Sequence, residues 1–261
     1  MPDLRCVGRS FSRRRHCESR DGVRLGDRVH RPRCKSAALT ESLLVHLEAV
    51  GFGGSPRFLG EDERGRQVLS FVSGDVYGDQ RPPWIEDEVV NAQVLGRVAA
   101  FVRRLHEATR EFVPPAGVEP FRSLPLPGET WNHADVHYGN IVFDGREPIG
   151  LIDWDCCAPG SRLYDPSTLM LIARCPKPSD PDSPQRQRAA SLAFAAVLDG
   201  YGATDDERAA FPASIAATVD DVADFLSEPE GLCVVGESID DREQATSELR
   251  WQAKWWRESR I

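Results

Sequence analysis

The chain has little lysine, no long apolar run and no glycine-rich phosphate-binding motif. Its 261 residues include three lysines, Lys35, Lys177 and Lys254, beside 29 arginines, and no G-x-G-x-x-G occurs. No apolar stretch approaches the roughly 20 residues that a membrane-spanning helix needs. The start of the chain also lacks the apolar region of a secretory signal. The sequence therefore predicts neither a membrane protein nor a secreted one.

The cysteines form no metal-binding or disulfide pattern. There are seven of them, an odd number; Cys156 and Cys157 are adjacent, and no C-x-x-C is present. This argues against a zinc site or a disulfide framework. We therefore expect free thiols in a reducing, cytoplasmic environment.

Charge is unevenly placed along the chain. The formal net charge is −9; residues 1–35 hold eleven Lys/Arg and four Asp/Glu, a net +7, which leaves −16 for the remainder. An acidic protein of this kind is not expected to bind nucleic acid. Residues 220–250 hold ten acids against two arginines. This segment is interpreted either as a solvated helix face or as an acidic rim that attracts a cationic substrate.

One segment carries the pattern of a phosphate-transfer site. His133, Asp135 and Asn140 follow the spacing H-x-D-x-x-x-x-N, and Asp153 comes thirteen residues after Asn140. The apolar runs 140–144 and 148–154 flank Gly145 and predict a β-hairpin. Such a hairpin would bring Asp153 back beside Asn140. Each motif alone is common in loops, but their order indicates one proton acceptor and two oxygen ligands suited to Mg²⁺.

This segment resembles the aminoglycoside phosphotransferase family, the small-molecule kinases related to choline kinase. The matching elements are HADVHYGN (133–140) and IDWD (152–155). The resemblance implies that Asp135 is the catalytic base and that Asn140 and Asp153 hold Mg²⁺. It also implies that His133 braces the loop, and that the acid of a "YDP" element, Asp165, braces the loop or the metal strand. The expected phosphate donor is ATP or GTP.

The first part of the chain reads as a small sheet with one helix. Two short strands are expected around the Gly26-Asp27 turn, and two more within 57–74. Between them Ser36 is expected to cap a helix over 37–50, whose leucines recur every fourth residue. This order is similar to the N-terminal lobe of a kinase. We therefore expect an atypical segment at 1–20, a nucleotide-binding lobe at 21–74 and a catalytic, substrate-binding lobe at 75–261.

The second part reads as mostly helical. Helices are predicted from 86 to about 111, after a turn within 157–175, at 186–201, at 205–227 and from about 241 to 260. Residues 113–130 form a proline-rich loop. His106 is interpreted as a structural histidine. Trp251 and Trp255 are expected to pack on the lobe rather than bind a ligand.

The phosphate-binding cation departs from the family pattern. Arg31 stands where the strand lysine is expected; it is interpreted as a bidentate phosphate ligand or as a surface residue of an edge strand. Its expected helix partner is Glu41, with Glu48 as the alternative. The arginine-rich start and the missing glycine hairpin raise the hypothesis of a truncated, frame-shifted or degenerate N-terminus.

These observations predict an α+β, bilobal, protein kinase-like fold. The predicted function is transfer of a nucleotide phosphate to a hydroxyl of a small, cationic molecule. A non-catalytic pseudokinase that binds without turnover is the alternative. A protein kinase fits less well, because the sequence has HAD instead of HRD, IDW instead of DFG, and no A-P-E.

Overall fold

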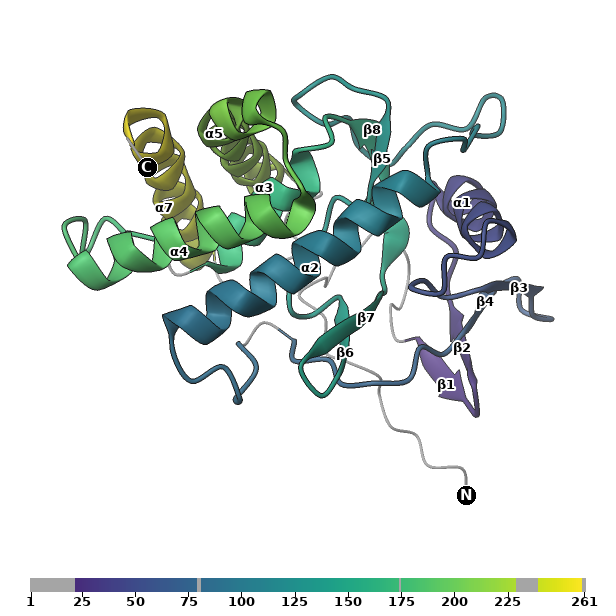
Figure 1. The fold of residues 1–261 in the computed structure, drawn as a ribbon. Helices are drawn as coiled ribbons and strands as arrows, with labels where there is room; N and C mark the ends of the chain where they lie inside the picture. Colours follow the sequence, from purple (N-terminus) through teal and green to yellow (C-terminus); the bar gives the residue numbers. More distant parts are fainter. Residues whose placement is uncertain (1–21, 79–80, 174, 229–238, 260–261) are drawn as a thin grey trace.

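The fold is known from a computed structural model, which describes residues 22–78, 81–173, 175–228 and 239–259 (Figure 1). The interpretation of residues 1–20 lies outside this part. A four-stranded antiparallel sheet comes first, with strand order β1-β2-β4-β3. Its strands are β1 (Val23–Leu25), β2 (Arg28–Arg31), β3 (Phe58–Glu61) and β4 (Gln67–Ser70). The predicted strands are confirmed.

Helix α1 (Ala37–Ala49) links β2 to β3. Leu39, Leu43 and Leu47 are fully buried on one face, as their spacing predicts. Ser36 precedes the helix, but its side chain makes no capping bond; the hydroxyl instead donates to the carbonyl oxygen of Asp155. Ser36 is thus the N-cap residue, as predicted, and its hydroxyl ties the helix start to the segment that follows the predicted hairpin.

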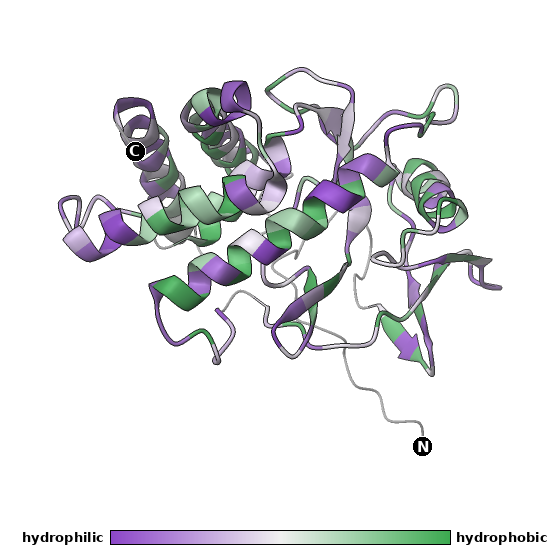
Figure 2. Cartoon of the chain, in the orientation of Figure 1, coloured by the Kyte–Doolittle hydropathy of each residue, from purple (hydrophilic) through white to green (hydrophobic). Residues whose placement is uncertain are grey.

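The rest of the described chain is mostly helical, as predicted. Its helices are α2 (Glu88–Ala108), α3 (Tyr164–Ile172), α4 (Pro184–Tyr201), α5 (Asp205–Ser227) and α7 (Ile239–Glu258). Hydrophobic and hydrophilic residues alternate along α2 in Figure 2, as expected for a helix with one buried face. One hydrophobic core runs from the leucines of α1 to Trp256 of α7. Trp255 packs against this core, as predicted.

Helices α2 and α4 approach so closely that glycine is needed at the contact. A Cβ atom on Gly200 would lie 2.0 Å from the backbone oxygen of Gly96. A Cβ atom on Gly96 would in turn lie 2.9 Å from the oxygen of Ala196. The two glycines thus set the distance between α2 and α4.

Two small β-ladders carry the candidate site. The predicted hairpin is formed by β6 (Ile141–Asp144) and β7 (Glu147–Leu151). A short 3₁₀ turn, η1 (Trp154–Cys156), follows it. The second ladder pairs β5 (Thr130–Asn132) with β8 (Ala158–Gly160). This ladder has no signal in the sequence, and it holds together the two ends of the segment that contains the candidate site residues.

The connection between the sheet and α2 runs along the hairpin. Asp75 and Phe143 exchange two backbone hydrogen bonds of 2.8 and 2.9 Å. Gly74 has φ +155°, and a Cβ atom there would lie 2.5 Å from the oxygen of Phe143. The boundary between the two lobes at residue 74 stays a prediction.

Candidate active site

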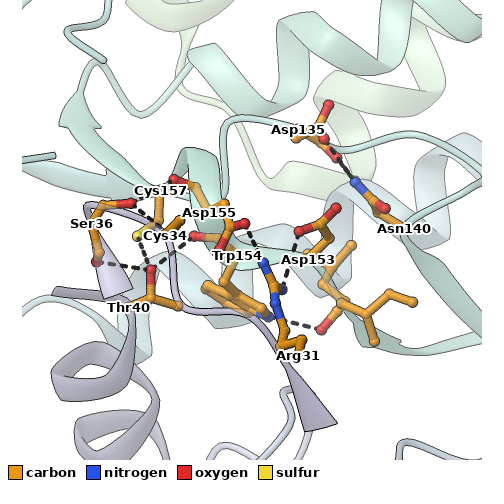
Figure 3. A network of polar contacts seen from close by, with 12 residues as sticks. Arg31, Cys34, Ser36, Thr40, Asp135, Asn140, Asp153, Trp154, Asp155 and Cys157 are labelled. Carbon is orange, nitrogen blue, oxygen red and sulfur yellow. Dashed lines mark hydrogen bonds and ion pairs between the residues drawn. The ribbon is translucent and has the colours of Figure 1, made fainter. Parts of the chain in front are cut away.

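The loop 133–140 and the strand that returns to Asp153 meet as predicted (Figure 3). The side-chain amide nitrogen of Asn140 donates to the backbone oxygen and to the carboxylate Oδ2 of Asp135, both at 2.9 Å. The backbone oxygen of Asn140 accepts from the nitrogen of Ile152 at 2.9 Å. Asp153 follows Ile152 directly, so the hairpin brings the three predicted side chains to one place.

The remaining oxygen of Asn140 fits a metal ligand. Its Oδ1 is buried and has no hydrogen-bond partner among the described residues. A buried acceptor of this kind calls for a ligand that donates to it or binds it. Within the described chain, no cluster of three or more His, Cys, Asp or Glu side chains could hold a metal. An amide oxygen plus one carboxylate is nevertheless the sparse, oxygen-only set with which Mg²⁺ binds beside phosphates.

The backbone is strained at two positions of this site. Ala134 (φ 63°) and Asp153 (φ 62°) are the non-glycine residues with positive φ in the described chain. Each such conformation costs on the order of 1–3 kcal/mol and persists only where the surroundings impose it. Both positions belong to the predicted site, since Ala134 directly precedes Asp135 and Asp153 is one of the predicted site residues.

Asp165 imposes the conformation of the loop. Its carboxylate is fully buried and accepts from the backbone nitrogens of His133 and Ala134, both at 2.8 Å. It also contacts Nε2 of His106 at 3.0 Å, while Nδ1 of that ring lies 2.8 Å from the hydroxyl of Tyr201. The resemblance left open whether Asp165 braces the loop or the strand that bears Asp153. The structure shows that Asp165 binds the loop 133–140. His106 is structural, as predicted.

His133 joins the loop 133–140 to the segment that leads into Asp153. Its ring is buried, lies 4.8 Å from the ring of Trp154, and has Nε2 3.0 Å from the oxygen of Ile152. Burial lowers the pKa of His133, against the opposing charges of Asp165, Asp135 and Asp153. We infer a neutral ring that donates from Nε2, because the partner of Nε2 is a carbonyl oxygen. Its catalytic assignment stays a prediction.

The predicted ion pair between Arg31 and Glu41 is wrong. Arg31 contacts Asp153 (Nη1–Oδ1 3.3 Å) and also Asp155, so its charge faces the hairpin (Figure 3). Glu41 pairs with Arg33 at 2.8 Å instead. The reason is position: Glu41 lies in α1 within reach of Arg33, while Arg31, the last residue of β2, faces the acids that follow the hairpin.

The alternative partner, Glu48, is also wrong, because it lies 3.7 Å from Arg57. Arg31 is not a free surface residue of an edge strand either, since β2 lies between β1 and β4.

Two polar residues near the site were missed as functional candidates. Asp155, to which no role was assigned from the sequence, shares Arg31 with Asp153. His137 has Nε2 3.7 Å from Oδ1 of Asp135. Two sequence features could have identified them. Asp155 is the second acid of D-x-D, and His137 is the second histidine of H-x-D-x-H.

A cleft of about 810 Å³ opens beside Asp155. Its walls come from the start of α1, the loop 117–123 and the end of α5. Five carboxylates line it together with Lys35 and Arg122, and they belong to Glu119, Asp155, Asp221, Asp224 and Glu228. The acidic segment that the sequence indicated thus contributes to a concave surface.

Several of these acids are paired internally. Asp221 binds Arg122 and accepts from the hydroxyl of Tyr164 at 2.6 Å, and Asp224 pairs with Arg250 of α7. Part of the acidic run therefore connects α5 to α3 and α7. Neither the solvated helix face nor the acidic rim included this structural role. Residues 229–238 of that run lie outside the described residues.

Comparison with known proteins identifies the family. The profile of the phosphotransferase enzyme family matches residues 121–211. Over 247 residues the chain is 31% identical to the trifolitoxin immunity protein of Rhizobium leguminosarum bv. trifolii, covering 89% of this chain and 87% of that protein. The chain belongs to the phosphotransferase enzyme family.

Solved structures of this family show the same fold. A mutant of aminoglycoside 2′-phosphotransferase-IIIa in complex with GDP superposes with a TM-score of 0.58 at 14% identity, over 97% of this chain and 92% of that one. A choline/ethanolamine kinase family protein from Mesorhizobium loti gives 0.56 at 16% identity, over 95% and 88%. The predicted α+β, kinase-like fold is confirmed. None of the helices in the described part of the chain has the length and apolarity needed to cross a bilayer.

Proposed function

We propose that this phosphotransferase-family protein moves the terminal phosphate of ATP or GTP to a hydroxyl of a small, cationic molecule. The observation that carries the proposal is the amide of Asn140. Its nitrogen donates twice to Asp135, and its buried oxygen is left for a ligand beside the strand end that bears Asp153. A proton acceptor and two oxygen ligands in one place are what phosphoryl transfer requires.

In this proposal, Asp135 orients the acceptor hydroxyl and takes its proton late in the transfer. His133 keeps the loop against the metal strand, and Asn140 with Asp153 would hold Mg²⁺. The bound cation would offset the charge that builds on the phosphate oxygens. Arg31 would contact the nucleotide phosphates, for which a planar guanidinium is suited. Catalysis by these residues is positioning and electrostatic stabilisation.

The acceptor would enter through the cleft beside Asp155. Five carboxylates against one lysine and one arginine make its lining acidic. Arg31 and Arg250, outside the lining, offset two of these carboxylates, and the remaining negative charge favours a cation. The aromatic pair Phe121–Phe225, 6.3 Å apart in an edge arrangement, adds an apolar wall. The relative named trifolitoxin immunity protein supports a toxin as one class of acceptor.

The nucleotide step is tested by calorimetric titration with ATP and with GTP, in Mg²⁺ and again in EDTA. We expect binding that depends on the metal. Asp153→Asn should remove that dependence, while Asp144→Asn, an exposed acid at the end of β6, should leave it unchanged. Unchanged Mg²⁺ dependence in Asp153→Asn would refute the assignment of Asp153.

The transfer step is tested by phosphate transfer to a panel of hydroxylated amines. Asp135→Ala should lose at least about 100-fold in turnover, in line with removal of a general base, and keep nearly full nucleotide affinity. Near-normal turnover in this variant would remove Asp135 from the base role.

Binding without turnover is the second candidate, favoured by the lack of a G-x-G-x-x-G motif. In that case the wild-type protein would bind an acceptor but would show no metal-dependent binding of nucleotide.

A further inference from the structure

Arg31 bridges two carboxylates that come from one short segment. Its Nη1 lies 3.3 Å from Oδ1 of Asp153, and its Nη2 binds Oδ2 of Asp155. The three side chains are each about one-fifth exposed, at 19% for Arg31 and 20% for both acids. In Figure 3 the guanidinium lies between the two acids. The pair is therefore partly desolvated, where Coulombic terms exceed those at an open surface.

The surroundings fix the bridge from both ends. Arg31 ends β2 in the sheet, and the hydroxyl of Ser36 donates to the backbone oxygen of Asp155 at 3.3 Å. Burial lowers the pKa of Arg31, but the charges of Asp155 and Asp153 outweigh this and raise the pKa above its usual value. The guanidinium is thus a permanent positive charge held on the carboxylate assigned above to the metal.

We propose that Arg31 competes with the divalent cation for Asp153, and that Asp155 is a positioning residue that keeps Arg31 at the site when Asp153 is taken. The inference rests on the proposed function, because it uses Asp153 as a metal ligand. Asp155 thereby acquires a role of its own, which is to hold the arginine and not the metal.

The charges explain why the competition matters. The two carboxylates exceed the one guanidinium by a single negative charge, so a bare divalent cation entering the cluster would leave three positive charges against two negative ones. Nucleotide phosphates supply the missing negative charge and offer Arg31 a bidentate partner. The metal should therefore bind well together with a nucleotide and poorly without one. The bridge would select for the metal–nucleotide complex.

Titration with Mn²⁺ in the absence of nucleotide tests the competition. Binding is followed by the decrease in the electron paramagnetic resonance signal of free Mn²⁺. Removing the charge in Arg31→Met should tighten Mn²⁺ binding by about tenfold or more. Arg33→Met is the matched control, since Arg33 also bridges two carboxylates, Glu41 and Glu61, away from the hairpin. It should behave as wild type.

A second variant keeps the test decisive if Arg31→Met does not fold. In Arg31→Lys the ammonium cannot span both acids in the same way, so Mn²⁺ affinity should rise, by less than in Arg31→Met. Wild-type Mn²⁺ affinity in the folded Arg31 variants would overturn the competition. Asp153→Asn distinguishes a failure of this inference from a failure of the proposed function. If this variant keeps its metal–nucleotide binding, the assignment of Asp153 as a metal ligand in the proposed function fails.

The role of Asp155 has its own readout. Asp155→Asn should raise the KM for the nucleotide while kcat is largely retained, because Arg31 is no longer held beside the phosphates. Mn²⁺ binding without nucleotide should be no tighter than in the wild type, since Arg31 still covers Asp153 and one negative charge beside it is lost. An unchanged KM would overturn the positioning role.

Discussion

Replacing Asp165 by asparagine should destabilise the protein and displace the catalytic loop. The carboxylate is fully buried and receives the backbone N–H groups of His133 and Ala134 together with Nε2 of His106. Asparagine is nearly the same size but offers one acceptor oxygen in place of two. If that oxygen stays at the Oδ2 position, the nitrogen of Ala134 faces an amide group that cannot accept its hydrogen.

The expected loss can be worked out from these contacts. An unsatisfied buried donor costs about 1–3 kcal/mol, and bonds to a charged acceptor exceed those to a neutral one. We therefore expect a loss of about 3 kcal/mol in the free energy of unfolding. For a chain of this length that corresponds to a decrease of roughly 6–12 °C in Tm. Turnover should fall as well, because Ala134 keeps its positive φ only while Asp165 holds it.

The assay is urea and thermal unfolding of Asp165→Asn beside Asp144→Asn, an exposed acid at the end of β6. The urea midpoint should fall with an unchanged m-value in the first variant, and the second should match wild type. A loss below about 0.5 kcal/mol, typical of surface substitutions, would show that Asp165 does not hold the loop.

Two further predictions concern stability. Because burial lowers the pKa of His133, the unfolded chain takes up a proton near pH 6.5 that the folded chain excludes. Stability is thus present above about pH 6.5 and falls below it. His133→Gln should flatten this fall by up to about 1.4 kcal/mol per pH unit, measured by urea unfolding at pH 5 to 8; an identical slope would contradict a neutral buried ring. Gly200→Ala should cost more than about 2 kcal/mol by overpacking, since the new methyl meets Gly96, whereas Gly53→Ala, in open space, should be neutral; equal midpoints would contradict the close helix contact.

Local sequence patterns were sufficient to predict most of the helices and strands. The four-residue leucine spacing of α1 and the glycine turn of the hairpin are short-range signals, and both elements are confirmed. The β5–β8 ladder could not be predicted in this way. Its strands have three residues each and pair across almost thirty positions, so the pairing depends on tertiary contacts and not on local propensity.

The same division holds for the site. The spacing of Asp135, Asn140 and Asp153 indicated their convergence, because a hairpin is a local structure. The partner of Arg31 was mispredicted, because the arginine contacts a carboxylate 122 positions away. Long-range ion pairs leave no periodic trace in a sequence, and family analogy directed attention to the helix acid Glu41 instead.

The amide of Asn140 also explains why a carboxylate, the more usual Mg²⁺ ligand, would not serve at this position. An aspartate there would turn its second oxygen toward the carboxylate of Asp135, across a contact that is now 2.9 Å. Two carboxylates at that distance repel each other, which disfavours the charged form of each. The neutral amide instead donates a hydrogen to Asp135 and still leaves its own oxygen on the other side. The chemical identity of residue 140 thus decides whether its contact with residue 135 is attractive or repulsive.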